Sequence, residues 1–133
     1  MAIADTNSIV RAYLVTCGTL TALIGGATPR IYCPRLPENT TLPALGFFTR
    51  GGSSNPYIPG IVTPSIQFDC WGNNLIEARQ VYRALYDNLQ GAQNYPFEIL
   101  SAIEEVQGQD LVDVEIPNYF RVLTFFSMMI RAE

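Results

Sequence analysis

The chain has 133 residues and a formal net charge of −4, and its eight basic side chains are all arginine, with no lysine and no histidine. Without histidine it has no Ser-His-Asp or Cys-His nucleophile and no imidazole metal ligand. Without lysine it has no Schiff-base amine and no phosphate-binding P-loop. The acidic balance and the scattered arginines give no basic surface for duplex nucleic acid. We therefore expect no enzyme activity, no cofactor and no bound metal.

Charged residues make up 15% of the chain, whereas a typical soluble domain has roughly 25%. A monomer of 14.8 kDa exposes on the order of 7,000 Å² of surface, so the charges are thinly spread. This scarcity predicts that part of the surface is covered by other copies of the chain or by a partner protein.

Cysteine spacing and hydropathy exclude further classes. Cys17, Cys33 and Cys70 are too far apart in sequence for a zinc ribbon or a redox pair, so we expect free thiols in a reducing cytoplasm. The longest apolar stretch, residues 122–130, is too short to cross a bilayer, which takes about 20 residues. The first eight residues contain no basic segment typical of a secretion signal, so we expect no membrane association.

The first elements in chain order are helical and then extended. Residues 5–17 predict an N-terminal helix, because an apolar stripe recurs at helical spacing and Asp5 or Thr6 can cap its start. A second short helical turn, capped by Thr19, is expected up to residue 24. Two prolines in residues 30–37 exclude a helix or a central strand, so this segment is predicted to be an extended connector or a short edge strand.

Two strands and the clearest helix come next. Residues 43–50 and 62–71 are predicted strands, and the Gly/Ser/Pro-rich residues 51–61 between them predict a flexible hairpin loop. In the helix, Asn74 can be the N-cap with Glu77 completing a capping pattern. An apolar stripe follows, and Gly91 is placed to end the helix.

The final strands complete the fold. Residues 97–107 and 119–131 are predicted strands, joined by a hairpin connection over 108–118 with solvated acids. Both faces of the strand at 119–131 are apolar, so each face must be covered by other protein. The helix layer covers one face, and a subunit neighbour or the first helix must cover the other. We predict a single α+β domain over residues 1–133. Its antiparallel β-sheet has about four or five strands, with the N-terminal helix and one long helix packed on it.

Eight side chains are candidates for protein contacts. They are apolar residues of the 51–61 loop, or they lie on a strand face that points away from the core. They are Tyr57, Ile58, Ile61, Asp69, Trp71, Leu123, Phe125 and Met129. Packing within the loop would also explain the loop residues. Asp69 is either a polar contact between subunits or an ordinary solvent-facing residue. Trp71 is either a core or rim anchor or a binding hot spot.

The order and spacing of several short motifs resemble one known family. The motifs are Ile31-Tyr-x-Pro34, Leu36-Pro37, Leu42-Pro43-Ala44, Pro64-Ser-Ile-Gln-Phe-Asp-Cys-Trp71, Glu77-Ala78 with Leu85, and the strand from Tyr119 to Arg131. Together they span nearly the whole chain and resemble the tail-terminator (tail-completion, or tail-to-head joining) family of tailed bacteriophages. The sequence departs from that pattern in its longer loop at 51–60 and in residues 17–19, where Asp-Pro is more usual.

The resemblance implies a non-enzymatic virion protein, assembled in the bacterial host cytoplasm, that forms a ring at the junction of tail and head. The ring, usually a hexamer, would end growth of the tail tube protein on one face and bind the head-tail connector or stopper protein on the other. DNA would pass through its lumen without specific binding. Acids lining the lumen would repel phosphates, and the candidates are Glu104, Glu105, Asp110, Asp113 and Glu115.

Three alternatives stay open at this point. The first is another ring protein of the phage neck or tail tube, which shares the strand-rich α+β character. The second is a cytosolic adaptor or regulatory oligomer. The third is an enzyme or small-ligand binder, which would need a pocket of convergent polar groups that the sequence does not indicate.

Overall fold

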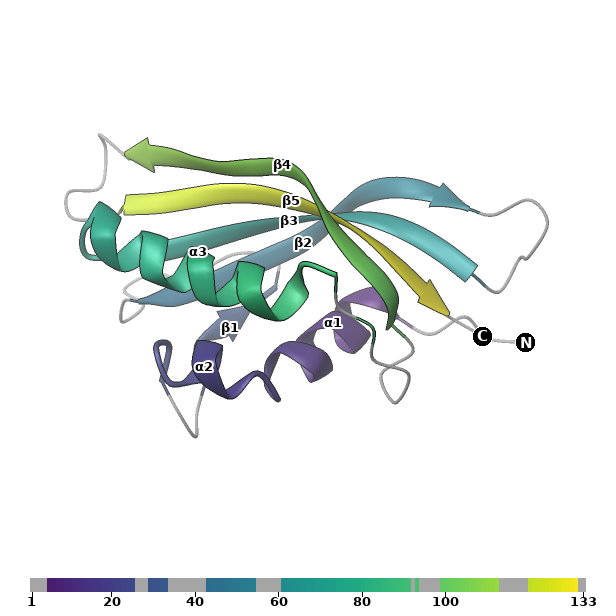
Figure 1. Ribbon diagram of the computed structural model, residues 1–133, viewed down its shortest axis with the longest axis horizontal. Coiled ribbons are helices and arrows are strands. Elements are labelled where there is room, and N and C mark those ends of the chain that lie inside the picture. Colours follow the sequence, from purple (N-terminus) through teal and green to yellow (C-terminus); the bar gives the residue numbers. More distant parts are fainter. Residues whose placement is uncertain are drawn as a thin grey trace.

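One five-stranded sheet carries all the helices on a single face (Figure 1). The computed structural model describes residues 5–25, 29–33, 43–54, 61–91, 93, 99–112 and 120–131. The helices are α1 (Thr6–Leu14), α2 (Gly18–Thr21) and α3 (Leu75–Leu89). The strands are β1 (Ile31–Tyr32), β2 (Ala44–Ser54), β3 (Ile61–Gly72), β4 (Ile99–Val112) and β5 (Phe120–Arg131). The predicted α+β class is confirmed.

The strand order in the sheet is β1-β2-β3-β5-β4. The four long strands pair antiparallel, as the sequence predicts, and β5 lies between β3 and β4. The two-residue β1 pairs parallel with β2 at the edge. It lies in the segment that two prolines confine to a connector or a short edge strand.

The core fills the space between the sheet and the helices. Alternate residues of β3 point toward α3, and their ring contacts continue across the strands. The Phe68 ring lies 5.9 Å from the Phe47 ring on β2 and 5.6 Å from the Phe126 ring on β5. On the helix side, Val10 and Leu14 of α1 are fully buried in the same cluster. All three helices therefore pack on one face of the sheet.

The caps of the helices follow the sequence signals closely. The Asp5 side chain accepts the Asn7 amide at 3.1 Å, and the Asn74 side chain accepts the Glu77 amide at 2.8 Å. These bonds satisfy donors that a helix start leaves without partners. Gly91 has φ +73°, the left-handed conformation favoured after a helix end. The short helix α2 begins after Cys17 as its N-cap, so the predicted cap at Thr19 is wrong.

The first half of the predicted hairpin loop is strand. Residues 51–54 continue β2, and Gly52, Ser53 and Ser54 pair with residues 62–64 of β3. The prediction of a loop from residue 51 is wrong because the two glycines form a bulge instead of a turn. Gly51 and Gly52 have φ +118° and +132°, and a Cβ on Gly52 would lie 2.2 Å from the Thr63 carbonyl oxygen. Tyr57 and Ile58 lie outside the described residues.

The strand β4 is longer than the sequence predicts. It continues to Val112, so residues 108–112 are paired strand instead of a hairpin connection. The register with β5 shifts between Glu104 and Val106 and again between Val106 and Gln109. These irregularities accommodate Gly108 within the strand, which explains why a turn-like Gly-Gln-Asp sequence does not end it. Asp113 and Glu115 lie outside the described residues.

Candidate interaction face and its polar supports

The face of the sheet opposite the helices is the candidate site, and we call it the outer sheet face. Residues directly opposite one another across two strands share a side of the sheet, and three such pairs define its centre. Trp71 lies opposite Arg121, Asp69 opposite Leu123, and Gln67 opposite Phe125. The first helix packs on the other face, so that predicted alternative for covering β5 is wrong. In the described part of the chain no helix covers the outer sheet face.

Apolar side chains are spread over this face. Leu123 and Phe125 are half-buried, and Met129 is 37% exposed. The neighbouring strand β4 adds Ile103, which is 56% exposed and lies opposite Ser127. These partly exposed apolar residues agree with the covered surface that the low charge content predicts. The predicted loop residue Ile61 is half-buried at the start of β3, at the far end of the sheet.

Arg50 crosses the outer sheet face. It lies on β2, and its guanidinium carbon lies 3.9 Å from the centre of the Phe125 ring on β5. Its Nε donates to the Ser65 hydroxyl at 3.0 Å, and its Nη2 lies 3.8 Å from Glu105 on β4. The ion pair is exposed and contributes little by itself. The main contact of Arg50 is the cation–π contact of its guanidinium with the Phe125 ring. Phe125 is half-buried under this contact.

Asp69 is the most buried charged group on this face. It is only 6% exposed, so the interpretation as an ordinary solvent-facing residue is wrong. Arg121 Nη1 lies 3.5 Å from Asp69 Oδ1, and the Arg121 guanidinium lies 5.3 Å from the Trp71 ring. Burial raises the pKa of the Asp69 carboxyl, and Arg121 opposes this shift. The half-exposed Trp71 thus lies beside a charged pair on the outer sheet face.

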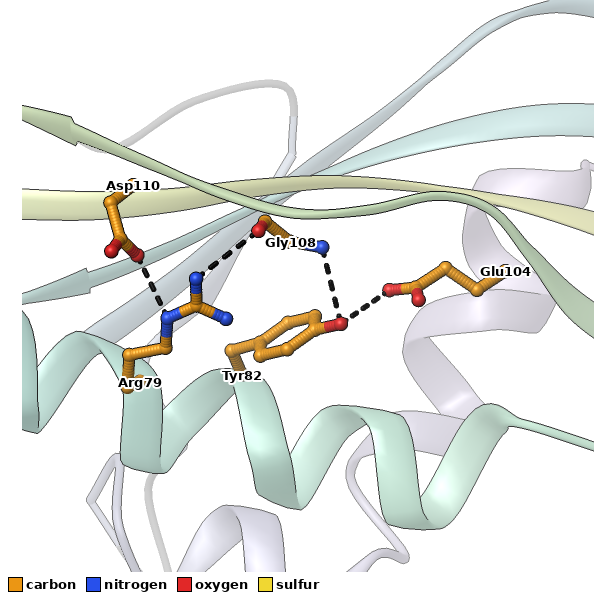
Figure 2. Close-up of polar contacts among 5 residues, drawn as sticks. All are labelled: Arg79, Tyr82, Glu104, Gly108 and Asp110. Carbon is orange, nitrogen blue, oxygen red and sulfur yellow. Dashed lines mark hydrogen bonds and ion pairs between the residues drawn. The ribbon is translucent and has the colours of Figure 1, made fainter.

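A polar cluster joins β4 to α3 on the other face (Figure 2). Glu104 Oε2 accepts hydrogen bonds from the Tyr82 hydroxyl at 2.7 Å and from the fully buried Thr124 hydroxyl at 2.6 Å. Arg79 Nε lies 2.8 Å from Asp110 Oδ1. Burial, followed by the hydrogen bond to Glu104, raises the pKa of Tyr82 to about 12. The tyrosine therefore remains a hydrogen-bond donor at all physiological pH values.

The five predicted lumen acids do not share one surface. Glu105 is exposed on the outer sheet face beside Arg50, whereas Glu104 and Asp110 face α3. Glu104 and Glu105 therefore point to opposite faces of the sheet, as expected for neighbouring strand residues. Glu104 is engaged by two internal hydroxyls, which gives it a structural role in the cluster. Asp113 and Glu115 belong to the segment that the structure does not describe.

Sequence reasoning missed the arginines that organise these contacts. Arg50 and Arg121 each reach an aromatic ring and a carboxylate on another strand, whereas Arg79 lies over the Tyr82 ring of its own helix and pairs with Asp110 on β4. No short-range pattern marks them, because each carboxylate partner is far away in sequence. Their one signal is the complete absence of lysine, since a planar guanidinium can stack on a ring and pair with a carboxylate at once.

The described residues offer little for catalysis or metal binding. Among them no group of three or more Cys, Asp or Glu side chains could hold a metal ion. The three cysteines form no disulfide, and no helix in the described part is long and apolar enough to cross a membrane. A shallow open groove between α2 and α3 is lined by Thr19, Leu23, Gln80, Arg83, Ala84, Asp87 and Asn88.

Comparison with known proteins gives a likeness of fold. No protein-family model matches the sequence, and no curated protein matches it. Among solved structures, a chain from the "Virion of native gene transfer agent (GTA) particle" is similar, with a TM-score of 0.64 and 15% sequence identity. The likeness covers 94% of this chain and 93% of that one. At this low identity it shows a shared fold over nearly the whole length.

Proposed function

We propose that the chain is a structural protein of a phage-like particle and forms a ring, with six copies as the expected number, at the head-proximal end of the tail. The ring ends growth of the tail tube and joins it to the head connector, and DNA passes through the lumen. The observation that carries the proposal is the outer sheet face, which no helix of the described residues covers and which carries partly exposed apolar side chains. The full-length fold likeness to a virion chain supports it.

A ring requires each copy to present two different surfaces, one to each neighbour. The outer sheet face is suited to be one of them. It carries apolar and aromatic side chains, and its two arginines, Arg50 and Arg121, are stacked on rings and paired with carboxylates, in keeping with the enrichment of aromatic residues and arginine at protein interfaces. Leu123, Phe125 and Met129, bordered by Asp69 and Trp71, are the proposed contact residues, and Ile61 extends the contact along β3.

Particles that lack this protein test the position. Electron microscopy is expected to show separate heads together with tails of abnormal length, because nothing ends the tube or joins it to the connector. Normal virions would refute the proposal. Labelling the protein in intact particles distinguishes the neighbouring ring roles: a tail terminator gives one ring at the top of the tail, whereas a tube protein gives a signal along its whole length.

A substitution on the outer sheet face tests the contact surface. Phe125→Asp places a charge at the centre of the face and is expected to abolish joining of heads to tails. Phe125→Leu is the matched control, because it keeps an apolar group at the same position and is expected to retain joining. Circular dichroism and thermal unfolding of both purified variants establish that they fold. A folded Phe125→Asp variant that still assembles normal particles would rule out this face as the contact.

A further inference from the structure

The strand β4 is an edge strand of the sheet. An open edge strand can pair with other chains, which would disturb a protein that must associate in a defined way. An edge strand presents unpaired amides and carbonyls that can template another strand. At 14 residues, β4 is the longest strand of the sheet. Four backbone groups of β4 are bound by α3 or by the residues just after it.

The first half of this edge is held by the end of α3. The Gly91 amide donates to the Ala102 carbonyl at 2.7 Å, and the Glu104 amide donates to the Gln90 side-chain oxygen at 2.8 Å. In an antiparallel strand, residues on either side of a hydrogen-bonded pair direct their backbone groups away from the partner strand. The Ala102 carbonyl and the Glu104 amide, two residues apart, both bond to residues after α3, so we assign them to the free edge.

The second half of the edge is held by two side chains from the middle of α3. The Gly108 amide donates to the Tyr82 hydroxyl at 3.2 Å, and Arg79 Nη2 donates to the Gly108 carbonyl at 3.2 Å (Figure 2). The ion pair between Arg79 and Asp110 fixes the guanidinium in this position. Gly108 lies where the register with β5 shifts, so both of its backbone groups turn toward the helix.

We propose that Arg79, Tyr82, Gln90 and Gly91 form an edge lock, which prevents a second copy of the chain from adding to the sheet through β4. The lock therefore closes the β4 edge of the sheet to strand-to-strand growth. This matters most for a protein whose copies are concentrated at one place, since strand addition has no built-in limit on the number of copies. The inference concerns the isolated chain and holds whether or not the ring proposal is correct.

The test is an unlocked variant that carries Arg79→Met, Tyr82→Phe and Gln90→Ala in the full chain. Its matched control carries Gln80→Ala, Arg83→Met and Tyr86→Phe on the same helix, none of which bonds to β4 among the contacts described. Amide hydrogen exchange and light scattering are measured for both at low and at high protein concentration. At low concentration, the Glu104 and Gly108 amides of the unlocked variant are expected to exchange about fivefold or more faster than in the control, the effect of one lost hydrogen bond.

At high concentration, the unlocked variant is expected to form larger species in which the same two amides become protected again. That result locates the new contact at β4. If the amides exchange faster but the variant remains monomeric at every concentration, the lock does not control association and the proposal is overturned. Unchanged exchange would overturn it as well.

A single substitution covers the case in which the triple variant unfolds. Gln90→Ala removes only the bond to the Glu104 amide, so exchange is expected to rise at Glu104 and not at Gly108. Equal changes at both amides would show general loosening of the helix and would contradict a local lock. Because these measurements use the purified chain, their outcome is independent of the particle experiments above.

Discussion

Gly108→Ala is the substitution for which the structure gives the sharpest expectation. A Cβ at this position would lie 2.7 Å from Cζ of Tyr82, 2.8 Å from Cγ1 of Val122 and 2.9 Å from Cε1 of Tyr82. All three distances are shorter than real Cβ contacts, and they approach from α3 on one side and β5 on the other. One added methyl group must therefore push the helix and the strand apart at the polar cluster.

The expected cost is that of an overpacked core, about 1–3 kcal/mol in the free energy of unfolding. With a slope of about 2 kcal/mol per molar, the urea midpoint would fall by about 1 M. Gly18→Ala is the matched control, because a Cβ there meets nothing within 4 Å. That change is expected to raise the stability by about 0.4–1 kcal/mol through the unfolded state.

Repeating Gly108→Ala in a Tyr82→Leu chain separates two causes of the stability loss, steric overlap with the Tyr82 ring and a change in the backbone. In a Tyr82→Leu chain the ring atoms that the new methyl meets are gone, so the further cost of Gly108→Ala is expected to shrink. Urea unfolding followed by circular dichroism measures all four chains. A Gly108→Ala variant as stable as the parent, or an equal cost in both backgrounds, would refute the packing argument.

Three further predictions concern single groups. Because burial raises the folded-state pKa of Asp69 above its ordinary value, its ionisation favours the unfolded state, and its contribution to stability falls as the pH rises through that pKa. The stability of Asp69→Asn relative to the parent is therefore expected to increase from about pH 4 to pH 7, and a flat difference in urea unfolding would contradict this. Of the three thiols, the exposed Cys33 is expected to react with an alkylating reagent in the native chain, whereas Cys17 and Cys70 react only after denaturation. Mass spectrometry counts the labels, and rapid native labelling of Cys70 would contradict its complete burial. If Asp113 and Glu115 line the lumen, their joint replacement by Lys is expected to slow release of DNA from the particle, and unchanged ejection would exclude that role.

The sequence predicted those parts of the fold that depend on local periodicity. The helix α3, with its cap at Asn74 and its end at Gly91, and the alternating strand β3 follow directly from side-chain spacing. The outward apolar face of β5 was predicted as well, because a strand that is apolar on both sides must be covered by other protein on both sides. These signals lie within a dozen neighbouring residues, where the pattern of burial is regular.

The remainder depended on contacts between residues far apart in sequence. The continuation of β2 through Gly51 and Gly52 was missed because glycine pairs mark turns far more often than bulges, and only the partner strand β3 distinguishes the two. The extension of β4 past Gly108 was missed for the same reason. The candidate site was predicted in its apolar residues but not in its arginines, since the stacking of Arg50 on Phe125 joins residues 75 positions apart.

The order of the strands also governs when the domain can form. Because β5 lies between β3 and β4, neither of those strands has its central neighbour until residues 120–131 have been synthesised. The intervening helix α3 can form earlier but has only part of a sheet to pack on. Pairings between such distant segments are slow to form, so the domain is expected to acquire its fold only once residues 120–131 have been synthesised. Before that point a nascent chain has no complete outer sheet face with which to join an assembly.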